Sequence, residues 1–247
     1  MFKKLLAAVG VGGAKVNTVV TGGDLQPGGP IKGVVVVKGG DVDQTIEGLR
    51  IRLMTEVEVE VGDNKMRQGH VLAEWPIRFA GVLPAGEERR MPFEAILPWE
   101  TPVTVIPGIP RGVKVWLQTG LAIDDAVDAS DRDELRILPL PVMRHVMAAI
   151  EAAGFRPMSA DVEKGQLRGR GFQSTLGCYQ EIEFRPIGFS KAWRFNEIEL
   201  SFVARPDQLH LVIEVDRSFA RDSFQSISLP HTASAEQVRD QVGYVLR

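Results

Sequence analysis

The sequence has a single cysteine, Cys178, among its 247 residues, and this scarcity excludes several kinds of site. An internal disulfide needs two thiols and a cysteine zinc site needs at least two, so neither forms within this chain. The four histidines lie singly, without the helical or hairpin spacing that a zinc site requires. We therefore predict no metal site of these types, and the cysteine usage fits a reducing compartment.

Long apolar runs and an excess of one charge are also missing. No run approaches the roughly 18 residues of a membrane-spanning helix. With 29 Lys and Arg against 32 Asp and Glu, the chain has no electrostatic footprint for nucleic acid. The opening MFKKLLAAVGVGGA is too short in apolar residues for a clear secretory signal, and we interpret it as a short N-terminal helix. We expect a cytoplasmic protein with no nucleic-acid partner and no integral membrane association.

The familiar catalytic and ligand-binding motifs are absent as well. There is no GxSxG elbow, Cys178 lacks papain-like surroundings, and GVGGAK has neither GxGxxG spacing nor a GK[ST] ending. An EF-hand loop starting at Asp124 would have Ala129 in place of its glycine and Leu135 in place of its glutamate. We therefore expect no enzyme, no cofactor and no metal.

Alternation of apolar and polar residues over short segments is what the sequence does contain. In VKVWLQTGLAI, Val115, Leu117 and Leu121 share one face, as in a strand with one buried side. Further strands are expected in AKVNTVV, IKGVVVVK, TEVEVEV, EWPIRFAGV, RMPFEAIL, QEIEFRP, NEIELSFVA and LHLVIEVDR. Turn-rich segments such as IPGIPRG separate them. Several short strands without intervening helices predict an antiparallel sandwich of about 130 residues in the first half.

Helical patterns are expected mainly in the second half of the chain. VMRHVMAAIEAAG follows Pro141, which suits a first helical turn, and stops at Gly154. Ser234 and Gln237 form a capping-box pattern ahead of the last apolar residues. The fold prediction is mainly β, with two antiparallel β-sandwich domains, at residues 1–134 and 135–247, a short N-terminal helix, an interdomain helix near 141–153 and a C-terminal helix near 234–246.

The segment SDRDELRILPLP, residues 130–141, joins the two predicted domains. Pro139 and Pro141 each fix φ and push the preceding residue out of the helical region. We therefore predict a semi-rigid linker at these two prolines.

The late hairpin EIELSFVARPDQLHLVIEVD permits a prediction of register. A turn at residues 205–208 places apolar side chains opposite one another on one face. The other face then sets Glu199 opposite Glu214 and Glu197 opposite Asp216. Like charges that face each other repel. This face is either balanced by neighbouring cations and solvent or is an acidic interaction face for a basic partner or a cation.

Three segments together are similar to a known bacterial family: MFKKLLAAVGVGGAKVNT, DASDRDELRILPLPVMRHVMAAIEAAGF and NEIELSFVARPDQLHLVIEVDRSF. They resemble the sporulation-control family of the sporulation stage-zero protein M type, over nearly the whole chain. The resemblance implies an arrestin-like fold and a non-catalytic cytoplasmic regulator or scaffold in the control of sporulation or cell division. The implied partners are other proteins, among them division or cytoskeletal components, and a second copy of the chain.

The arrestin-like resemblance also implies that charged contacts hold the two domains in relation, and it points to Asp131, Arg132 and Asp133 for an interdomain polar contact. Breaking a buried charged pair costs about 3–5 kcal/mol, whereas an exposed pair is worth about 0–1 kcal/mol. The alternative is a solvated turn at the end of a strand.

A second function stays open from the sequence, a β-sandwich module that binds carbohydrate or calcium. It predicts exposed aromatic side chains grouped on one face, drawn from Trp75, Trp99, Trp116 and Trp193.

Overall fold

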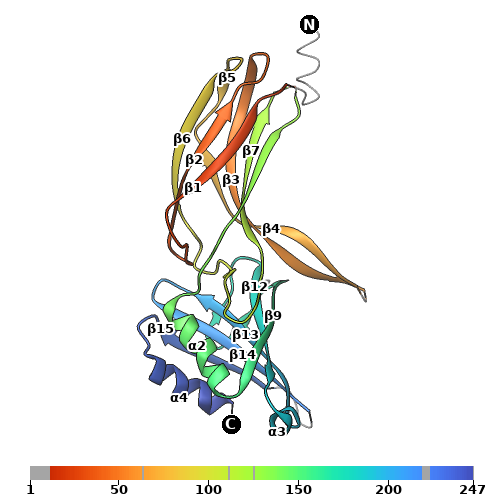
Figure 1. Ribbon diagram of the computed structural model, residues 1–247, viewed down its shortest axis with the longest axis vertical. Helices are drawn as coiled ribbons and strands as arrows, with labels where there is room; N and C mark the ends of the chain where they lie inside the picture. The colour runs from red at the N-terminus through yellow and green to blue at the C-terminus, as the bar shows by residue number, and fades with distance from the viewer. Residues whose placement is uncertain (1–11, 63, 111, 125, 219–222, 247) are drawn as a thin grey trace.

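The computed structural model describes residues 12–62, 64–110, 112–124, 126–218 and 223–246. The predicted N-terminal helix therefore lies outside the described residues. Figure 1 shows an elongated molecule with two parts stacked along its long axis. We call residues 12–134 the N-terminal half and residues 135–246 the C-terminal half.

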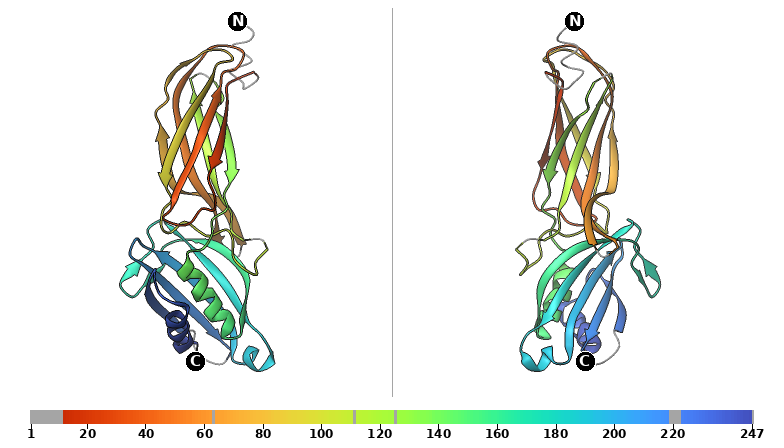
Figure 2. Two further views of the ribbon diagram at one scale, coloured as in Figure 1. Left: turned by 60° about the vertical axis from the view of Figure 1, so that its left-hand side comes forward. Right: turned by 90° about the vertical axis from the view of Figure 1, so that its right-hand side faces the viewer.

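The N-terminal half is a sandwich of two sheets that face each other (Figure 2). The first sheet has the order β1 (Lys15–Thr21), β2 (Pro30–Lys38), β6 (Glu88–Ile96). In the second, β3 (Gln44–Val61) pairs with β4 (Asn64–Ile77), β5 (Gly81–Leu83) and β7 (Val115–Ile123), and β7 pairs with β8 (Ala129–Glu134). Along β2 and β7, buried residues alternate with more exposed ones. Val35 of β2, Leu53 of β3 and Leu117 of β7 are fully buried. This confirms the alternation on which the strand prediction rests.

The C-terminal half contains one antiparallel sheet instead of a second sandwich. Its order is β15 (Ser223–Pro230), β14 (Gln208–Arg217), β13 (Phe195–Ala204), β12 (Cys178–Pro186), β9 (Phe155–Lys164). The helices α2 (Pro141–Ala152) and α4 (Ala235–Val245) cover one face of it (Figure 1). Short elements complete it: the strands β10 (Arg168–Gly169) and β11 (Phe172–Gln173) and the helix α3 (Phe189–Ala192).

The two long helices explain why this half needs no second sheet. On α2, Val146 and Ile150 are fully buried, and on α4 so are Val238 and Val242. These side chains cover the apolar face of the sheet, which a facing sheet would otherwise do. The helix that the sequence places between domains packs against α4 and β9, within the C-terminal half.

The helix boundaries follow the sequence patterns closely. Pro141 is the first residue of α2. The capping box of α4 is confirmed, because the Gln237 backbone N–H donates to Ser234 Oγ at 3.2 Å and the Ser234 backbone N–H donates to Gln237 Oε1 at 2.9 Å. In the part of the chain that the structure describes, no helix is long and apolar enough to cross a membrane.

A strand pairing joins the two halves, in addition to the covalent connection at residues 134–135. Glu58 of β3 and Glu163 of β9 form a parallel bridge, which links the C-terminal sheet to the second N-terminal sheet in one hydrogen-bonded path. The loop of residues 97–114, between β6 and β7, also packs against the C-terminal half, where Gly108 lies against Pro157. The division into domains at 1–134 and 135–247 stays a prediction.

Candidate functional site

Asp131, Arg132 and Asp133 lie on the edge strand β8. Asp131 Oδ2 accepts a hydrogen bond from the backbone N–H of Thr18 at 2.6 Å, which ties β1 to β8. The guanidinium of Arg132 lies 4.0 Å from the ring centroid of Trp116. Burial, followed by the charge of Asp131, raises the pKa of Asp133 to about 6. These contacts are all internal to the N-terminal half, so the interdomain role stays a prediction that they do not support.

Pro139 and Pro141 lie where the chain enters the C-terminal half. The carbonyl of Pro139 accepts hydrogen bonds from Gln26 Nε2 at 3.2 Å and from Arg144 Nη1 at 3.1 Å. Gln26 belongs to the N-terminal half and Arg144 to α2. The predicted linker segment is therefore restrained from both sides.

A different carboxylate, Glu100 in the loop of residues 97–114, forms an ion pair between the halves. Its side chain is only 5% exposed and pairs with the guanidinium of Arg205, in the turn after β13. It also accepts hydrogen bonds from the backbone N–H of Thr175 at 2.8 Å and from the Thr175 hydroxyl at 2.7 Å. Arg205 Nη2 donates to the carbonyl of Gln173 at 2.6 Å. We call Glu100, Arg205 and Thr175 the junction.

Further polar contacts surround the junction. The side-chain amide of Gln180 on β12 donates to the carbonyl of Val103 and accepts from its backbone N–H, both at 2.9 Å. On β4, a ring nitrogen of His70 hydrogen-bonds with the carbonyl of Leu176 at 2.7 Å. Specific hydrogen bonds thus fix the halves in one relative position, since an unpaired buried polar group is costly.

The predicted acidic residues lie on the sheet face away from α2 and α4. The register places Glu199 opposite Glu214 and Glu197 opposite Asp216, as the sequence predicts. Strand β12 adds two carboxylates beside them. The acidic face comprises Glu181, Glu183, Glu197, Glu199, Glu214 and Asp216.

Burial and mutual repulsion perturb the centre of the acidic face. Burial, followed by the charge of Glu199, raises the pKa of Glu181 to about 8. Burial, followed by the charge of Glu214, raises the pKa of Glu199 to about 7. At the margin Glu197 Oε2 lies 3.8 Å from Arg185 Nη2, a distance typical of a weak exposed pair. Whether the face binds a partner stays a prediction.

The acidic face continues into a further group of carboxylates where β9 meets β3, because Asp161 is directly opposite Glu181. Glu58, Asp161 and Glu163 each offer an oxygen, and these oxygens are all within 4.8 Å of one another. Lys65 Nζ at 3.3 Å and Arg67 Nη2 at 2.9 Å already pair with Glu58. The hydrogen bond from Arg67 is the main cause that holds the pKa of Glu58 below its usual value. The protein's own cations thus balance this group in part.

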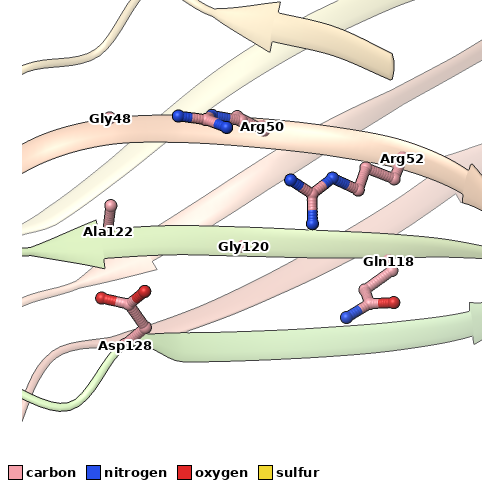
Figure 3. Close-up of a pocket in the computed structure, with 7 residues that line it drawn as sticks. All are labelled: Gly48, Arg50, Arg52, Gln118, Gly120, Ala122 and Asp128. Atoms are coloured by element: carbon pink, nitrogen blue, oxygen red, sulfur yellow. The ribbon is translucent and has the colours of Figure 1, made fainter. Parts of the chain in front are cut away.

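A shallow trough crosses the outer face of the second N-terminal sheet (Figure 3). Its volume is about 180 Å³. The residues that line it are Gly48, Arg50, Arg52, Gln118, Gly120, Ala122 and Asp128. A Cβ atom added at Gly48 or Gly120 would meet no atom within 4 Å, so the space above these glycines is open.

Two arginines line one side of the trough, and both lie near the carboxylate of Glu74. Arg52 Nε donates to Glu74 Oε2 at 2.5 Å, whereas Arg50 Nη1 is 3.9 Å from the same carboxylate, and the Arg50 side chain is 56% exposed. In Figure 3 the Arg52 guanidinium points from β3 toward β7. Asp128 Oδ1 accepts from the backbone N–H of Ile123 at 3.1 Å and so helps close the turn between β7 and β8. The arrangement offers charged donors to an anionic group above an open floor.

The sequence also matches a known family. The family model described as SpoOM protein matches residues 2–219. The chain belongs to the SpoOM protein family. This confirms the resemblance found in the sequence.

A curated sequence and a solved structure, both named Spo0M and both from Bacillus subtilis, match this SpoOM-family chain. The sporulation-control protein spo0M of strain 168 is 34% identical over 216 residues, which cover 87% of this chain and 80% of the relative. The crystal structure of Spo0M, described as a sporulation control protein, matches with a TM-score of 0.81 at 28% identity, over 96% of this chain and 98% of that chain. The mainly β fold is therefore confirmed, whereas the arrestin-like description stays a prediction.

The tryptophans of this SpoOM-family chain do not form the exposed cluster that carbohydrate binding predicts. Trp116 is 6% exposed and Trp193 is 62% exposed. Trp99 stacks on His231 with ring centroids 5.2 Å apart, and Trp75 packs against the core. The four rings therefore have different environments, which does not favour the second function.

Neither the junction nor the trough was predicted from the sequence. Glu100 lies in a proline-rich loop whose sequence predicts only a turn. Its partner Arg205 is 105 positions away, so no local pattern links the two residues. The position of the trough could have been predicted from two glycines in the sequence. Gly48 and Gly120 lie inside strands, and a glycine inside a strand often marks a place where another group approaches the backbone closely.

Proposed function

We propose that this chain is a non-catalytic cytoplasmic regulator in sporulation control, and that it acts by binding an acidic segment of another protein in the trough. The relative described as a sporulation-control protein supports the process. The observation that carries the binding proposal is the open floor of the trough beside Arg50 and Arg52. Division or cytoskeletal components are the partner class that the family resemblance favours.

The spacing of the two arginines supports an extended ligand. Arg50 and Arg52 are two positions apart on β3, so both side chains point to the same side of the sheet, about 6.6 Å apart along the strand. Alternate side chains of an extended peptide have the same spacing. A carboxylate on such a peptide would face Arg50, the more exposed guanidinium, and a second carboxylate would share Arg52 with Glu74. The glycine floor leaves room for the peptide backbone.

The chemistry of the described residues supports a binding role over a catalytic one. Nucleophilic catalysis requires a nucleophile poised beside a base. The seven trough residues include no serine, cysteine or histidine, and their one carboxylate, Asp128, is engaged with Ile123. Elsewhere Cys178 is buried, and burial raises the pKa of its thiol to about 12, the opposite of an activated thiolate.

Two trough variants test the proposal. Arg50→Glu reverses the charge of the most exposed trough cation, and Gly120→Val fills the floor at a position where an added Cβ meets no atom. We expect each to reduce recovery of the specific partner by about tenfold or more, which corresponds to about 1.4 kcal/mol of binding free energy. The measurement is quantitative affinity capture from the source cells with mass spectrometry.

The matched control is Lys32→Glu, which makes the same charge change on the outer face of the other sheet, where Lys32 pairs with Glu94 at 2.9 Å. It should recover the partner as the wild type does. Circular dichroism confirms that each variant is folded. Equal recovery by the trough variants and the control would contradict the proposal.

A further inference from the structure

Three highly exposed apolar side chains gather at the end of the C-terminal half that is far from the N-terminal half. Phe189 is 84% exposed, Trp193 62% and Ile187 58%. They belong to α3 and the residues that flank it, at the lower end of the molecule in Figures 1 and 2. The ring centroids of Phe189 and Trp193 are 6.3 Å apart, so they form one patch. We call these three residues the tip.

The tip stands on a packed base. Beneath it the buried rings of Phe155 and Phe195 pack edge to face, with centroids 5.5 Å apart. The backbone N–H of Ile187 donates to the carbonyl of Gly154 at 2.8 Å. Lys191 Nζ donates to the carbonyl of Ala153 and lies 4.8 Å from the Phe155 ring centroid. The exposed apolar side chains are therefore presented by a fixed scaffold.

Cationic side chains surround this base. Arg156 of β9 and Arg185 of β12 are directly opposite each other in the sheet. The guanidinium groups of Arg194 and Arg217 lie 5.4 Å and 5.0 Å from the Phe195 ring centroid. The cations near the tip are thus Arg156, Arg185, Lys191, Arg194 and Arg217.

Carboxylates also lie among these cations. Glu197 lies beside Arg185, with 3.8 Å between Oε2 and Nη2. Asp216 accepts hydrogen bonds from the side-chain amide of Asn196 at 3.0 and 3.1 Å. Glu151 lies in the last turn of α2, beside Ala153. Among the described residues, the five cations near the tip therefore outnumber the three carboxylates Glu151, Glu197 and Asp216, although the whole chain has a net charge of −3.

We propose that the tip binds the surface of a bilayer that contains anionic phospholipid. Phe189, Trp193 and Ile187 enter the headgroup region, where aromatic rings are favoured. The surrounding cations contact lipid phosphates, because basic side chains beside an apolar face are attracted to anionic membranes. This surface attachment adds to the proposed function, because the trough lies in the other half of the molecule.

The shape and charge of the molecule favour a bilayer over a folded protein as the occupant. The tip is a small apolar point at the end of the long axis, whereas a stable protein interface buries more than about 1,000 Å² between complementary surfaces. A small group of apolar side chains can enter a fluid headgroup layer, which adapts its shape, whereas a folded protein partner would need a complementary groove. Glu197 and Asp216 bring the margin of the acidic face to this end, where cations lie beside them. The centre of the acidic face, at Glu181, Glu199 and Glu214, lies farther along the strands and is repelled by an anionic bilayer.

Co-sedimentation of the full-length protein with large unilamellar vesicles tests this proposal. One set of vesicles contains phosphatidylcholine and phosphatidylglycerol, and the other contains phosphatidylcholine alone. We expect binding about tenfold or more stronger to the anionic vesicles, weakening as salt is added because the charge attraction is screened. The double variant Phe189→Ala and Trp193→Ala should lose about tenfold or more of that binding.

The matched control is the double variant Val82→Ala and Ile96→Ala, since these exposed apolar side chains lie on β5 and β6 of the N-terminal half, away from the tip. It should bind as the wild type does. A charge variant, Arg156→Glu with Arg194→Glu, should lose binding to the anionic vesicles. Circular dichroism confirms that the variants are folded.

Three outcomes overturn the proposal. The first is no sedimentation of the wild type with either vesicle. The second is equal binding by the wild type and the tip variant, or equal binding to both vesicles. The third is a self-association of the wild type, seen by sedimentation velocity without lipid, that the tip variant loses while vesicles have no effect, because the tip then contacts a second copy of the chain.

Discussion

Arg205→Ala is expected to lower the free energy of unfolding by about 3 kcal/mol, because it leaves a carboxylate in the junction without its cation. The Glu100 side chain is only 5% exposed, so its charge depends on the guanidinium for compensation. Its two hydrogen bonds from Thr175 remain, but they do not neutralise the charge. Urea denaturation followed by circular dichroism measures the change.

Arg132→Ala is the matched control for this prediction. Arg132 and Glu134 are both half-exposed or more, and Arg132 Nη2 is 3.7 Å from Glu134 Oε1. Losing such a pair and a ring contact costs about 1 kcal/mol or less. Adding Glu100→Gln to Arg205→Ala should recover part of the loss, since it removes the buried charge. Equal losses for Arg205→Ala and Arg132→Ala would contradict a stabilising role for the junction.

The same pair of variants shows which charged cluster fixes the arrangement of the halves. Small-angle scattering should detect a change of shape for Arg205→Ala and none for Arg132→Ala. A change for Arg132→Ala alone would support the interdomain role that the sequence suggests for residues 131–133.

Glu181→Gln is expected to stabilise the protein at pH 8 by roughly 2 kcal/mol or more, after allowance for the partial exposure of the side chain. The pKa of Glu181 rises from 4.5 to about 8, mainly through burial and then through the charge of Glu199. The folded state therefore holds this proton more tightly than the unfolded state. The stability that the protonated side chain supports is complete below pH 4.5 and is lost as the pH rises through 8.

Glutamine is neutral at every pH, so the variant lacks this loss. Thermal unfolding at several pH values should show the wild type weakening between pH 5 and 8 relative to Glu181→Gln, with little difference at pH 4.5. Glu94→Gln makes the same chemical change at an exposed position on β6 and serves as the control. A Glu181→Gln variant whose stability follows the wild type at every pH would contradict the raised pKa.

The elements predicted well from the sequence are those whose signals are local. The register of the hairpin between β13 and β14 is confirmed at every predicted pair, because alternation and turn position together fix it. The α4 cap is confirmed because Ser234 and Gln237 are three positions apart. The strand β15 was missed, since most of its side chains are exposed and it lacks apolar alternation.

The candidate sites were harder to predict because they combine distant segments. The edge strand β8 was interpreted as part of a joint, since its charged residues lack a buried alternate set, yet it pairs with β7 along its whole length. The Glu100–Arg205 pair depends on a loop that folds onto another sheet, which no local pattern encodes. The extension of the acidic face to β12 follows from strand order, which the sequence alone does not specify.

Photo-cross-linking from position 118 tests most directly whether the trough binds a protein. Gln118 lines the trough and is opposite Arg52 in the sheet. With p-benzoylphenylalanine at this position, irradiation of the source cells should yield one dominant protein adduct that Arg50→Glu abolishes. The same probe at Lys32, on the other sheet, should not give it. No adduct at position 118, or the same adduct at both positions, would contradict a binding role for the trough.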